Sequence, residues 1–154
     1  MFMTLNDLLT RQNVFNKLVL TDGDKELSKE LKVKLMRIRM AYSKIKKNFD
    51  AEVQDFTEEL MTDEFKELNN KVSRTPEEES RYKELSKIIE TDYQEFIKQK
   101  GFEEVDLGID GFLTLEEYTD VLDVNSGNDI VINNNEIKAA DFMEIVYELF
   151  VKEN

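Results

Sequence analysis

The chain has 154 residues, with 21 Lys and Arg against 34 Asp and Glu for a net charge of -13, and it contains no Cys, His or Trp. A chain of this length can bury one core without a disulfide or a structural metal. The absence of Cys and His excludes zinc fingers and thiol or Ser-His nucleophiles, so only oxygen-ligated cations such as calcium or magnesium remain to be considered.

The first twenty residues lack a basic start followed by an unbroken apolar run, so we expect no secretory signal. The chain also has no run of about eighteen apolar residues, so we expect no membrane span and no membrane partner. The protein is therefore predicted to stay in the reducing cytoplasm where it is made, or in a particle assembled there.

The charge is distributed unevenly along the chain. Residues 1–100 hold 19 basic and 20 acidic residues, whereas residues 101–154 hold 2 basic and 14 acidic ones. Within the first part, residues 25–47 hold nine basic and two acidic residues, and residues 50–79 hold eleven acidic and three basic ones. The last third of the chain is thus a strongly acidic unit.

The pattern near the N-terminus predicts a short helix. Thr4 can cap this helix and Asp7 stands at its third position, which is an N-terminal capping pattern. Its apolar face comprises Leu5, Leu8, Leu9, Phe15, Leu18 and Val19. A turn at residues 21–24 then leads into the next helix.

The clearest periodicity of the sequence predicts one long helix from Asp24 to near Phe65. Ten apolar residues recur at helical spacing without an intervening Gly or Pro: Leu27, Leu31, Leu35, Ile38, Tyr42, Ile45, Phe49, Val53, Phe56 and Leu60. Their nine steps cover 33 residues, a period of 3.67, which keeps an apolar stripe almost straight along a helix. At about 1.5 Å per residue the helix would be roughly 60 Å long.

A second long helix is predicted to begin after Thr75 and to end at Gly101. Thr75 is a suitable cap, and Pro76 suits the first helical position. Lysines in the last turn before Gly101 complete a stop signal. The two long helices would fold back on each other as an antiparallel hairpin, with residues 66–75 as the connection.

After Gly101 short apolar runs alternate with Gly, Asn and Asp, which is typical of strands and turns. We predict strands at residues 102–105 and 129–132, a short helix at residues 115–122, and a terminal helix at residues 137–150. No internal repeat that covers both halves of the chain is evident.

The predicted fold is therefore mostly α, with an α+β end. Residues 1–100 would form a long antiparallel helical hairpin with a short N-terminal helix. Residues 101–154 would form a small acidic α+β cap that contains a short β-hairpin and a terminal helix. We expect this cap to pack on the helical part within a single domain.

The basic stretch has two interpretations. Its candidate basic face comprises Lys32, Lys34, Arg37, Arg39, Lys44, Lys46 and Lys47. These cations can form a solvated helix flank that offsets acidic neighbours, or a face that contacts nucleic acid. A whole-chain charge of -13 repels phosphate, so we do not expect direct nucleic-acid binding.

The apolar stripe of the long helix also has two interpretations, because it is broader than one partner helix would cover. It can be core, or it can be an interaction surface to which flanking methionines adapt. The candidate interaction surface comprises Leu35, Met36, Met40, Tyr42, Phe49, Phe56, Met61 and Phe65.

Residues 106–117 resemble the twelve-residue EF-hand calcium loop. Asp106, Asp110 and Glu117 stand at positions one, five and twelve, and Gly111 stands at position six. However, Gly108 replaces the expected third ligand, and no convincing partner loop follows. An acidic turn before a short helix explains the same residues, so calcium is an alternative and no other cofactor is expected.

Nothing in the sequence points to catalysis. Adjacent acidic residues such as Glu116 and Glu117 point apart on a helix or strand, which disfavours two-carboxylate chemistry. The chain has no His and no Gly-rich phosphate loop. We therefore expect no enzyme and assign no catalytic residue.

In its layout the chain resembles a family of short, uncharacterised proteins of tailed bacteriophages, whose genes commonly lie among those for virion components. The resemblance rests on the Lys-rich entry to the long helix at residues 31–34 and 41–47, and on the acidic run at residues 52–67. A short strand-bearing end with a terminal helix completes it. The chain departs from the family at Lys32, where Pro is usual, and in an Asn-rich insertion at residues 125–135.

The resemblance implies no catalytic residue. It implies a non-enzymatic structural or virion-assembly protein that binds other phage proteins or further copies of itself, in the host cytoplasm during synthesis and then in the virion. Two alternatives remain. One is a small acidic inhibitor of a host nucleic-acid-binding or defence protein, which would act by charge mimicry, and the other is the calcium-binding module.

Overall fold

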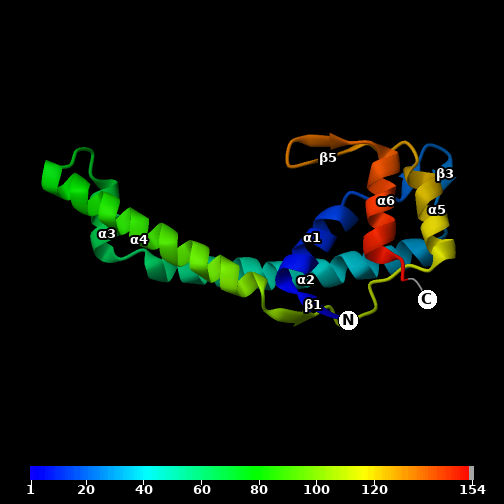
Figure 1. Ribbon diagram of the computed structural model, residues 1–154, viewed down its shortest axis with the longest axis horizontal. Coiled ribbons are helices and arrows are strands. Elements are labelled where there is room, and N and C mark those ends of the chain that lie inside the picture. Colours follow the sequence, from blue (N-terminus) through cyan, green and yellow to red (C-terminus); the bar gives the residue numbers. More distant parts are fainter. Residues whose placement is uncertain (153–154) are drawn as a thin grey trace. The chain divides into compact units, whose positions relative to one another are not determined.

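The computed structural model describes residues 1–152, and these residues form helices and pairs of short antiparallel strands (Figure 1). The helices are α1 (Leu5–Phe15), α2 (Lys29–Leu60), α3 (Asp63–Asn70), α4 (Pro76–Gly101), α5 (Leu115–Asn125) and α6 (Ala139–Phe150). The strands are β1 (Phe2–Thr4), β2 (Thr21–Asp22), β3 (Lys25–Glu26), β4 (Glu104–Asp106), β5 (Ile130–Ile132) and β6 (Asn135–Ile137). The predicted class, a mostly α fold with a C-terminal hairpin and helix, is confirmed.

The chain divides into two compact units. Unit 1 contains Met1–Ile45 together with the chain from Glu104 on, and unit 2 contains Lys46–Glu103. The boundary at Glu103 lies close to the predicted one, but the first 45 residues belong with the C-terminal part rather than with the helical hairpin. The physical reason is that α1 and the first half of α2 bury their apolar faces in the same core as α5 and α6.

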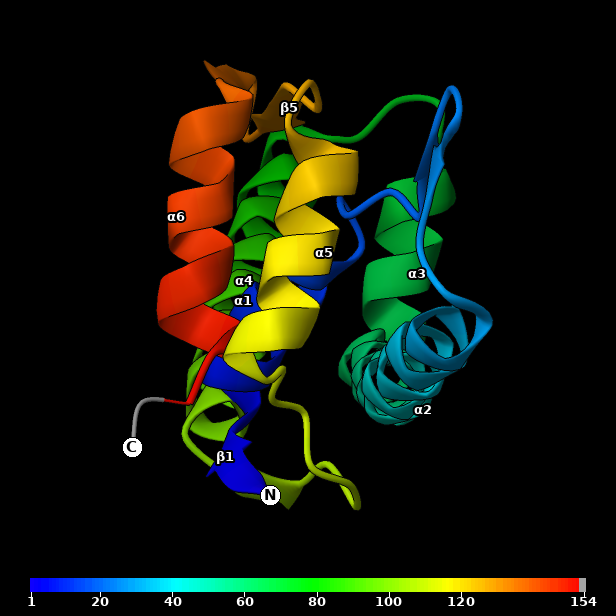
Figure 2. The same cartoon turned by 90° about the vertical axis from the view of Figure 1, so that its right-hand side faces the viewer.

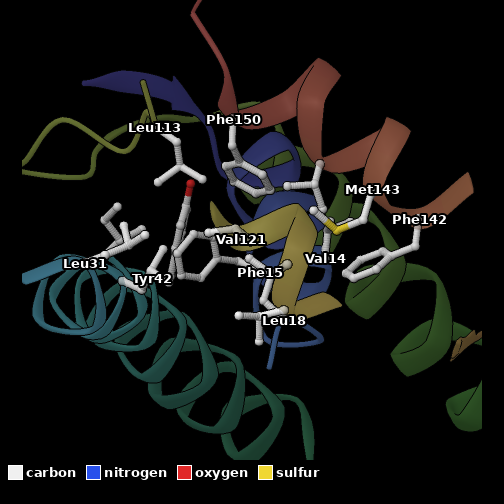
Figure 3. Close-up of a cluster of buried hydrophobic side chains, with 14 of the residues drawn as sticks. Val14, Phe15, Leu18, Leu31, Tyr42, Leu113, Val121, Phe142, Met143 and Phe150 are labelled. Atoms are coloured by element: carbon white, nitrogen blue, oxygen red, sulfur yellow. The ribbon is translucent and has the colours of Figure 1, made fainter. Parts of the chain in front are cut away.

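The core of unit 1 is built around aromatic side chains from three helices. Phe15 of α1 lies 5.9 Å from Tyr42 of α2 and 5.2 Å from Phe150 of α6, measured between ring centroids. Figure 3 shows these rings converging with Leu113 and Val121. Each of these five side chains is almost completely buried, so this cluster holds the ends of the chain together.

Unit 1 repeats one order of elements. α1, the β2–β3 hairpin and α2 recur as α5, the β5–β6 hairpin and α6, and Figure 2 shows α5 and α6 side by side. Both helix starts are displaced by 110 residues, from Leu5 to Leu115 and from Lys29 to Ala139. Few identities accompany this shift, with Thr4 matching Thr114 as the helix cap, so the sequence alone did not reveal the repeat.

The predicted start of the long helix at Asp24 is wrong. Residues 21–26 form the small β2–β3 hairpin, with Gly23 at a φ of 59° in its turn, and α2 begins at Lys29. The Ser28 hydroxyl accepts a hydrogen bond from the Leu31 N–H, as a helix cap does. Leu27 is buried outside the helix, so its helical spacing was coincidental.

The predicted end of the long helix near Phe65 is also wrong. α2 stops at Leu60, and a separate helix α3 begins after Thr62, whose hydroxyl accepts from the Phe65 N–H. α3 occupies Asp63–Asn70, so the predicted connection at residues 66–75 shortens to residues 71–75. The α4 start is confirmed, because Thr75 forms a reciprocal capping box with Glu78.

The short strands pair in a way that the sequence did not specify. The strand predicted at residues 102–105 is β4, which starts two residues later and ends one residue later, and it pairs antiparallel with β1 at the N-terminus. β5 and β6 form the predicted C-terminal hairpin. Asn133 and Asn134 occupy its turn with φ of 51° and 64°, a left-handed conformation that Asn tolerates well.

Candidate functional site

The helical hairpin of unit 2 has a narrow apolar seam. Phe56 of α2 stacks on Phe96 of α4 with ring centroids 4.1 Å apart, and Lys100 Nζ lies 2.7 Å from Glu52 Oε2. The residue number rises from Glu52 to Phe56 along α2 while that of the partner falls from Lys100 to Phe96 along α4. The second half of α2 and α4 are therefore antiparallel, as predicted. Glu52 raises the pKa of Lys100, which keeps the ammonium charged.

The apolar seam between α2 and α4 in unit 2 is only partly buried. Within Pro76–Gly101 no side chain is fully buried, although α4 is 26 residues long. Its partly buried apolar side chains are Tyr82, Leu85, Ile89, Tyr93, Phe96 and Ile97. Ile88 is still more exposed, at 48%. An amphipathic helix normally buries its apolar face, so α4 retains some apolar surface that a partner can cover.

At the end of the hairpin, α3 closes on α4 through one better-buried contact. Phe65 stacks on Tyr82 at 5.4 Å between ring centroids, and Arg81 binds Glu64 with a shortest distance of 2.6 Å. Phe65 and Leu68 are the buried apolar side chains here. The hydrogen bond from Arg81 lowers the pKa of Glu64, so this pair stays ionised at neutral pH.

The eight residues predicted as one interaction surface do not form one. Leu35 and Tyr42 lie in the core of unit 1, and Phe65 lies under α4 in unit 2. Phe49, Phe56 and Met61 are partly buried, whereas Met36 and Met40 are exposed. The prediction was wrong for the buried members because one helix of α2's length serves two cores, and its core-facing stripe was counted together with its flanking residues.

Much of the predicted basic face is neutralised within the chain. Lys32 pairs with Glu26, Lys34 with Glu117, and Lys46 with Asp50. An Arg39 nitrogen donates to the Leu18 carbonyl at 3.1 Å. Arg37, Lys44 and Lys47 form neither an ion pair nor a side-chain hydrogen bond with a residue of the described chain. Three dispersed free cations make a weak platform for a phosphate backbone.

The free cations of unit 1 lie beside exposed apolar side chains on α2. Val33, Met36 and Met40 are 39%, 52% and 68% exposed, and they follow one another at helical spacing. Arg37 and Lys44 lie on the same face. Next to it is a depression of about 380 Å³, lined by Glu30, Val33, Lys34, Arg37, Ile38, Ile109 and Asp110.

α5 and α6 expose the opposite charge. Their free carboxylates form no ion pair with a residue among 1–152, and they are Glu116, Asp120, Asp141, Glu144 and Glu148. α5 adds two exposed leucines, Leu115 at 63% and Leu122 at 37%. Sequence reasoning recognised this acidity but missed the leucines, although their separation by two helical turns was a usable signal.

The three carboxylates predicted as calcium ligands each have other partners. Asp106 accepts from the Gly108 N–H at 2.9 Å and from the N-terminal ammonium at 3.2 Å. Asp110 accepts from the Phe112 N–H. Glu117 caps α5 and binds Lys34. Within residues 1–152 no group of three acidic side chains is arranged to hold a metal ion.

Comparisons with known proteins give no relative. No family model, no curated protein and no solved structure matches the chain. No helix within the described part of the chain is long and apolar enough to cross a membrane.

Proposed function

We propose that this chain is a non-enzymatic structural or assembly protein of a tailed bacteriophage, which acts by binding other proteins. The observation that carries the proposal is the partly buried apolar seam of unit 2, where the 26-residue helix α4 buries no side chain completely. The resemblance in layout to phage proteins from virion gene regions supports the phage part of the proposal. The partner is another virion or assembly protein or a further copy of this chain.

Burial of the remaining apolar surface of α4 by a partner would be energetically favourable. Each partly buried aliphatic or aromatic side chain on α4 would contribute on the order of 1 kcal/mol at most if a partner buried the rest of it. Several such side chains follow one another along the helix, and Ile88 extends the strip away from the hairpin contact. A partner helix in this position would complete a small helical bundle.

The proposal places the protein in the host cytoplasm during synthesis and in the particle after assembly. Quantitative mass spectrometry of purified particles tests this directly. A fixed copy number per particle is expected. Absence from particles and from every assembly intermediate would contradict the proposal.

A pair of variants tests whether incorporation into particles depends on the apolar side of α4. Ile88→Glu places a charge on the exposed apolar strip, and Gln94→Glu adds the same charge at an exposed polar position of the same helix. We expect at least a tenfold loss of incorporation for Ile88→Glu and none for Gln94→Glu. Equal incorporation of the two variants would show that α4 is not the contact surface.

The free carboxylates of α5 and α6 favour a second candidate, the acidic inhibitor of a host nucleic-acid-binding or defence protein. Five exposed carboxylates without a cation partner can imitate a run of phosphates. Binding to such a target would weaken steeply with added salt. Incorporation into particles would not be expected, so the mass-spectrometry result separates the two candidates.

A further inference from the structure

α2 and α3 cover different parts of α4. Phe56 of α2 stacks on Phe96 with ring centroids 4.1 Å apart, whereas Phe65 of α3 stacks on Tyr82 at 5.4 Å. α3 contacts α4, and Figure 1 shows it beside the N-terminal half of that helix. Tyr82 is also the first member of the apolar side of α4, so α3 lies on one end of the surface that we assign to a partner.

A single unbroken helix could not form both stacks. Nine residues lead from Phe56 to Phe65, so in one helix these rings would lie about two and a half turns apart and point to opposite sides. Fourteen residues lead from Tyr82 to Phe96, about 21 Å of helix, while nine helical residues cover only about 14 Å. The break before α3 relieves both conflicts, because Thr62 is extended and α3 starts in a new direction.

The residues at the break do not themselves forbid a helix. No Gly or Pro lies between Leu60 and Phe65. The Thr62 hydroxyl accepts a hydrogen bond from the Phe65 N–H at 3.2 Å, which favours a helix start there. The break therefore depends on this cap and on the contacts of α3 with α4.

Few side chains hold α3 against α4. Phe65 and Leu68 are its buried side chains. Arg81 donates to the two carboxylate oxygens of Glu64 at 2.6 and 3.1 Å, but these side chains are 45% and 51% exposed, so water screens the pair. A helix of eight residues is not stable on its own. Detachment of α3 should therefore cost less than separation of the longer α2–α4 seam.

We propose that α3 is a reversible cover of the start of α4. It detaches at Met61 and Thr62 while the α2–α4 seam stays closed, and it has to detach before a partner can bind the whole apolar side of α4. This inference rests on the proposed function, since the partner is the protein that α4 binds during assembly. α3 is thus an autoinhibitory segment.

Competition gives the direction of the expected effect. α3 and a partner cannot both occupy the face of Tyr82 that Phe65 covers, so docked α3 lowers the apparent affinity for the partner. A change that weakens α3 docking without altering α4 should increase partner binding. Glu64 suits such a change, because it lies on α3 and pairs with Arg81 of α4.

Hydrogen exchange on the full chain tests the opening. Amides of α3 should exchange faster than those of α4 around Phe96. Glu64→Arg places a like charge opposite Arg81 and should speed exchange of α3 at least tenfold, with no change around Phe96. Exchanging the charges in Glu64→Arg/Arg81→Glu should restore slow exchange. Glu58→Arg makes the same charge change at an exposed position of α2 and should have no effect.

Competition for packaging tests the inhibitory role. Wild type and one variant are produced in equal amounts in the same infected cells, and mass spectrometry of purified particles gives their ratio. Glu64→Arg should be enriched at least threefold over the wild type. The charge-exchanged double variant should return towards a ratio of one, and Glu58→Arg should stay at one.

Three outcomes would overturn the proposal. If α3 exchanges no faster than the amides around Phe96, it opens only when the whole hairpin does. If Glu64→Arg is packaged at a ratio of one, α3 does not inhibit the contact, and if it is depleted, docked α3 forms part of the contact. These failures are separable from that of the proposed function, because absence of the wild type and of Glu58→Arg from particles would overturn the assembly function itself.

Discussion

Lys34 Nζ lies 2.6 Å from Glu117 Oε1, and this ion pair joins α2 to the first turn of α5. The same carboxylate oxygen accepts the Thr114 N–H at 2.9 Å, which completes the capping box of α5. Burial acts to raise the pKa of the Glu117 carboxyl, but the hydrogen bonds from Lys34 and Thr114 outweigh it and lower the pKa. One carboxylate thus stabilises a helix start and a contact between two helices of unit 1.

The Lys34–Glu117 pair should show measurable coupling in a double-mutant cycle. Both side chains are partly buried, so the pair is less screened than an exposed one. Glu117→Gln keeps an oxygen for the cap and removes the charge, while Lys34→Met keeps the packing. We expect a coupling free energy of about 0.5–1 kcal/mol from urea unfolding of the two single variants and the double variant. Strictly additive effects would show that the ion pair adds nothing.

Acid should destabilise unit 1 through its lowered carboxyl pKa values. Backbone donation from Gly108 and then the N-terminal ammonium lower the pKa of Asp106 from 3.8, and the pKa of Glu117 is lowered from 4.5. The folded chain therefore binds fewer protons than the unfolded chain near pH 4. The contribution of these carboxylates is complete above about pH 5 and is lost as the pH falls through the lowered values.

Urea unfolding between pH 7 and pH 3 checks this sign. The unfolding midpoint of the wild type should fall with acid, and the midpoint of Glu117→Gln should fall less, because one of the responsible groups is gone. Asp123→Asn is a suitable control, since Asp123 is exposed and its pairing with Lys25 at 3.5 Å is loose. Equal acid slopes for the wild type and Glu117→Gln would contradict the assignment.

Millimolar calcium should leave the melting temperature unchanged. Glu117, which would close an EF-hand loop, is already bound by Lys34 and Thr114, and Asp106 is held by Gly108 and the N-terminus. A calcium ion would have to break these contacts. A calcium-dependent increase that is absent in Glu117→Gln would instead support the calcium-binding alternative, and magnesium serves as the ionic-strength control.

Local signals in the sequence were sufficient for some helix starts but not for all of those that a capping residue marks. Thr4, Thr75 and the final helix were placed correctly because a cap or a strong apolar period identifies them. Thr62 carries the same signal before Asp63 and Glu64, but the apolar period continued across it to Phe65 and concealed the break between α2 and α3. Apolar periodicity alone cannot distinguish one long helix from two helices that follow each other in the sequence.

Partners distant in sequence could not be predicted. A two-residue strand such as β2 has too few residues to show an alternating pattern, and the pairing of β1 with β4 depends on the tertiary fold. The candidate surfaces depend on it too. Leu35 and Met36 are adjacent in sequence, yet one is buried and the other exposed, because the core of unit 1 covers only one side of α2.

Asn125 connects the two repeated halves of unit 1, and its removal should be costly. Its side chain is completely buried. Oδ1 accepts the Val19 N–H at 2.9 Å, and Nδ2 donates to the Val19 carbonyl at 3.1 Å and to the Val121 carbonyl at 2.9 Å. The amide therefore joins the end of α5 to the segment that follows α1.

Asn125→Ala leaves the Val19 N–H and carbonyl without these partners, and we expect a loss of about 2–3 kcal/mol in the free energy of unfolding. Asn125→Asp should cost at least as much, because a carboxylate oxygen would then face two carbonyl oxygens in a buried site. Ser126→Ala, at the next and exposed position, should change stability by less than about 0.5 kcal/mol. Urea unfolding monitored by circular dichroism measures all three, and a small effect of Asn125→Ala would show that the two halves are held together by the apolar core alone.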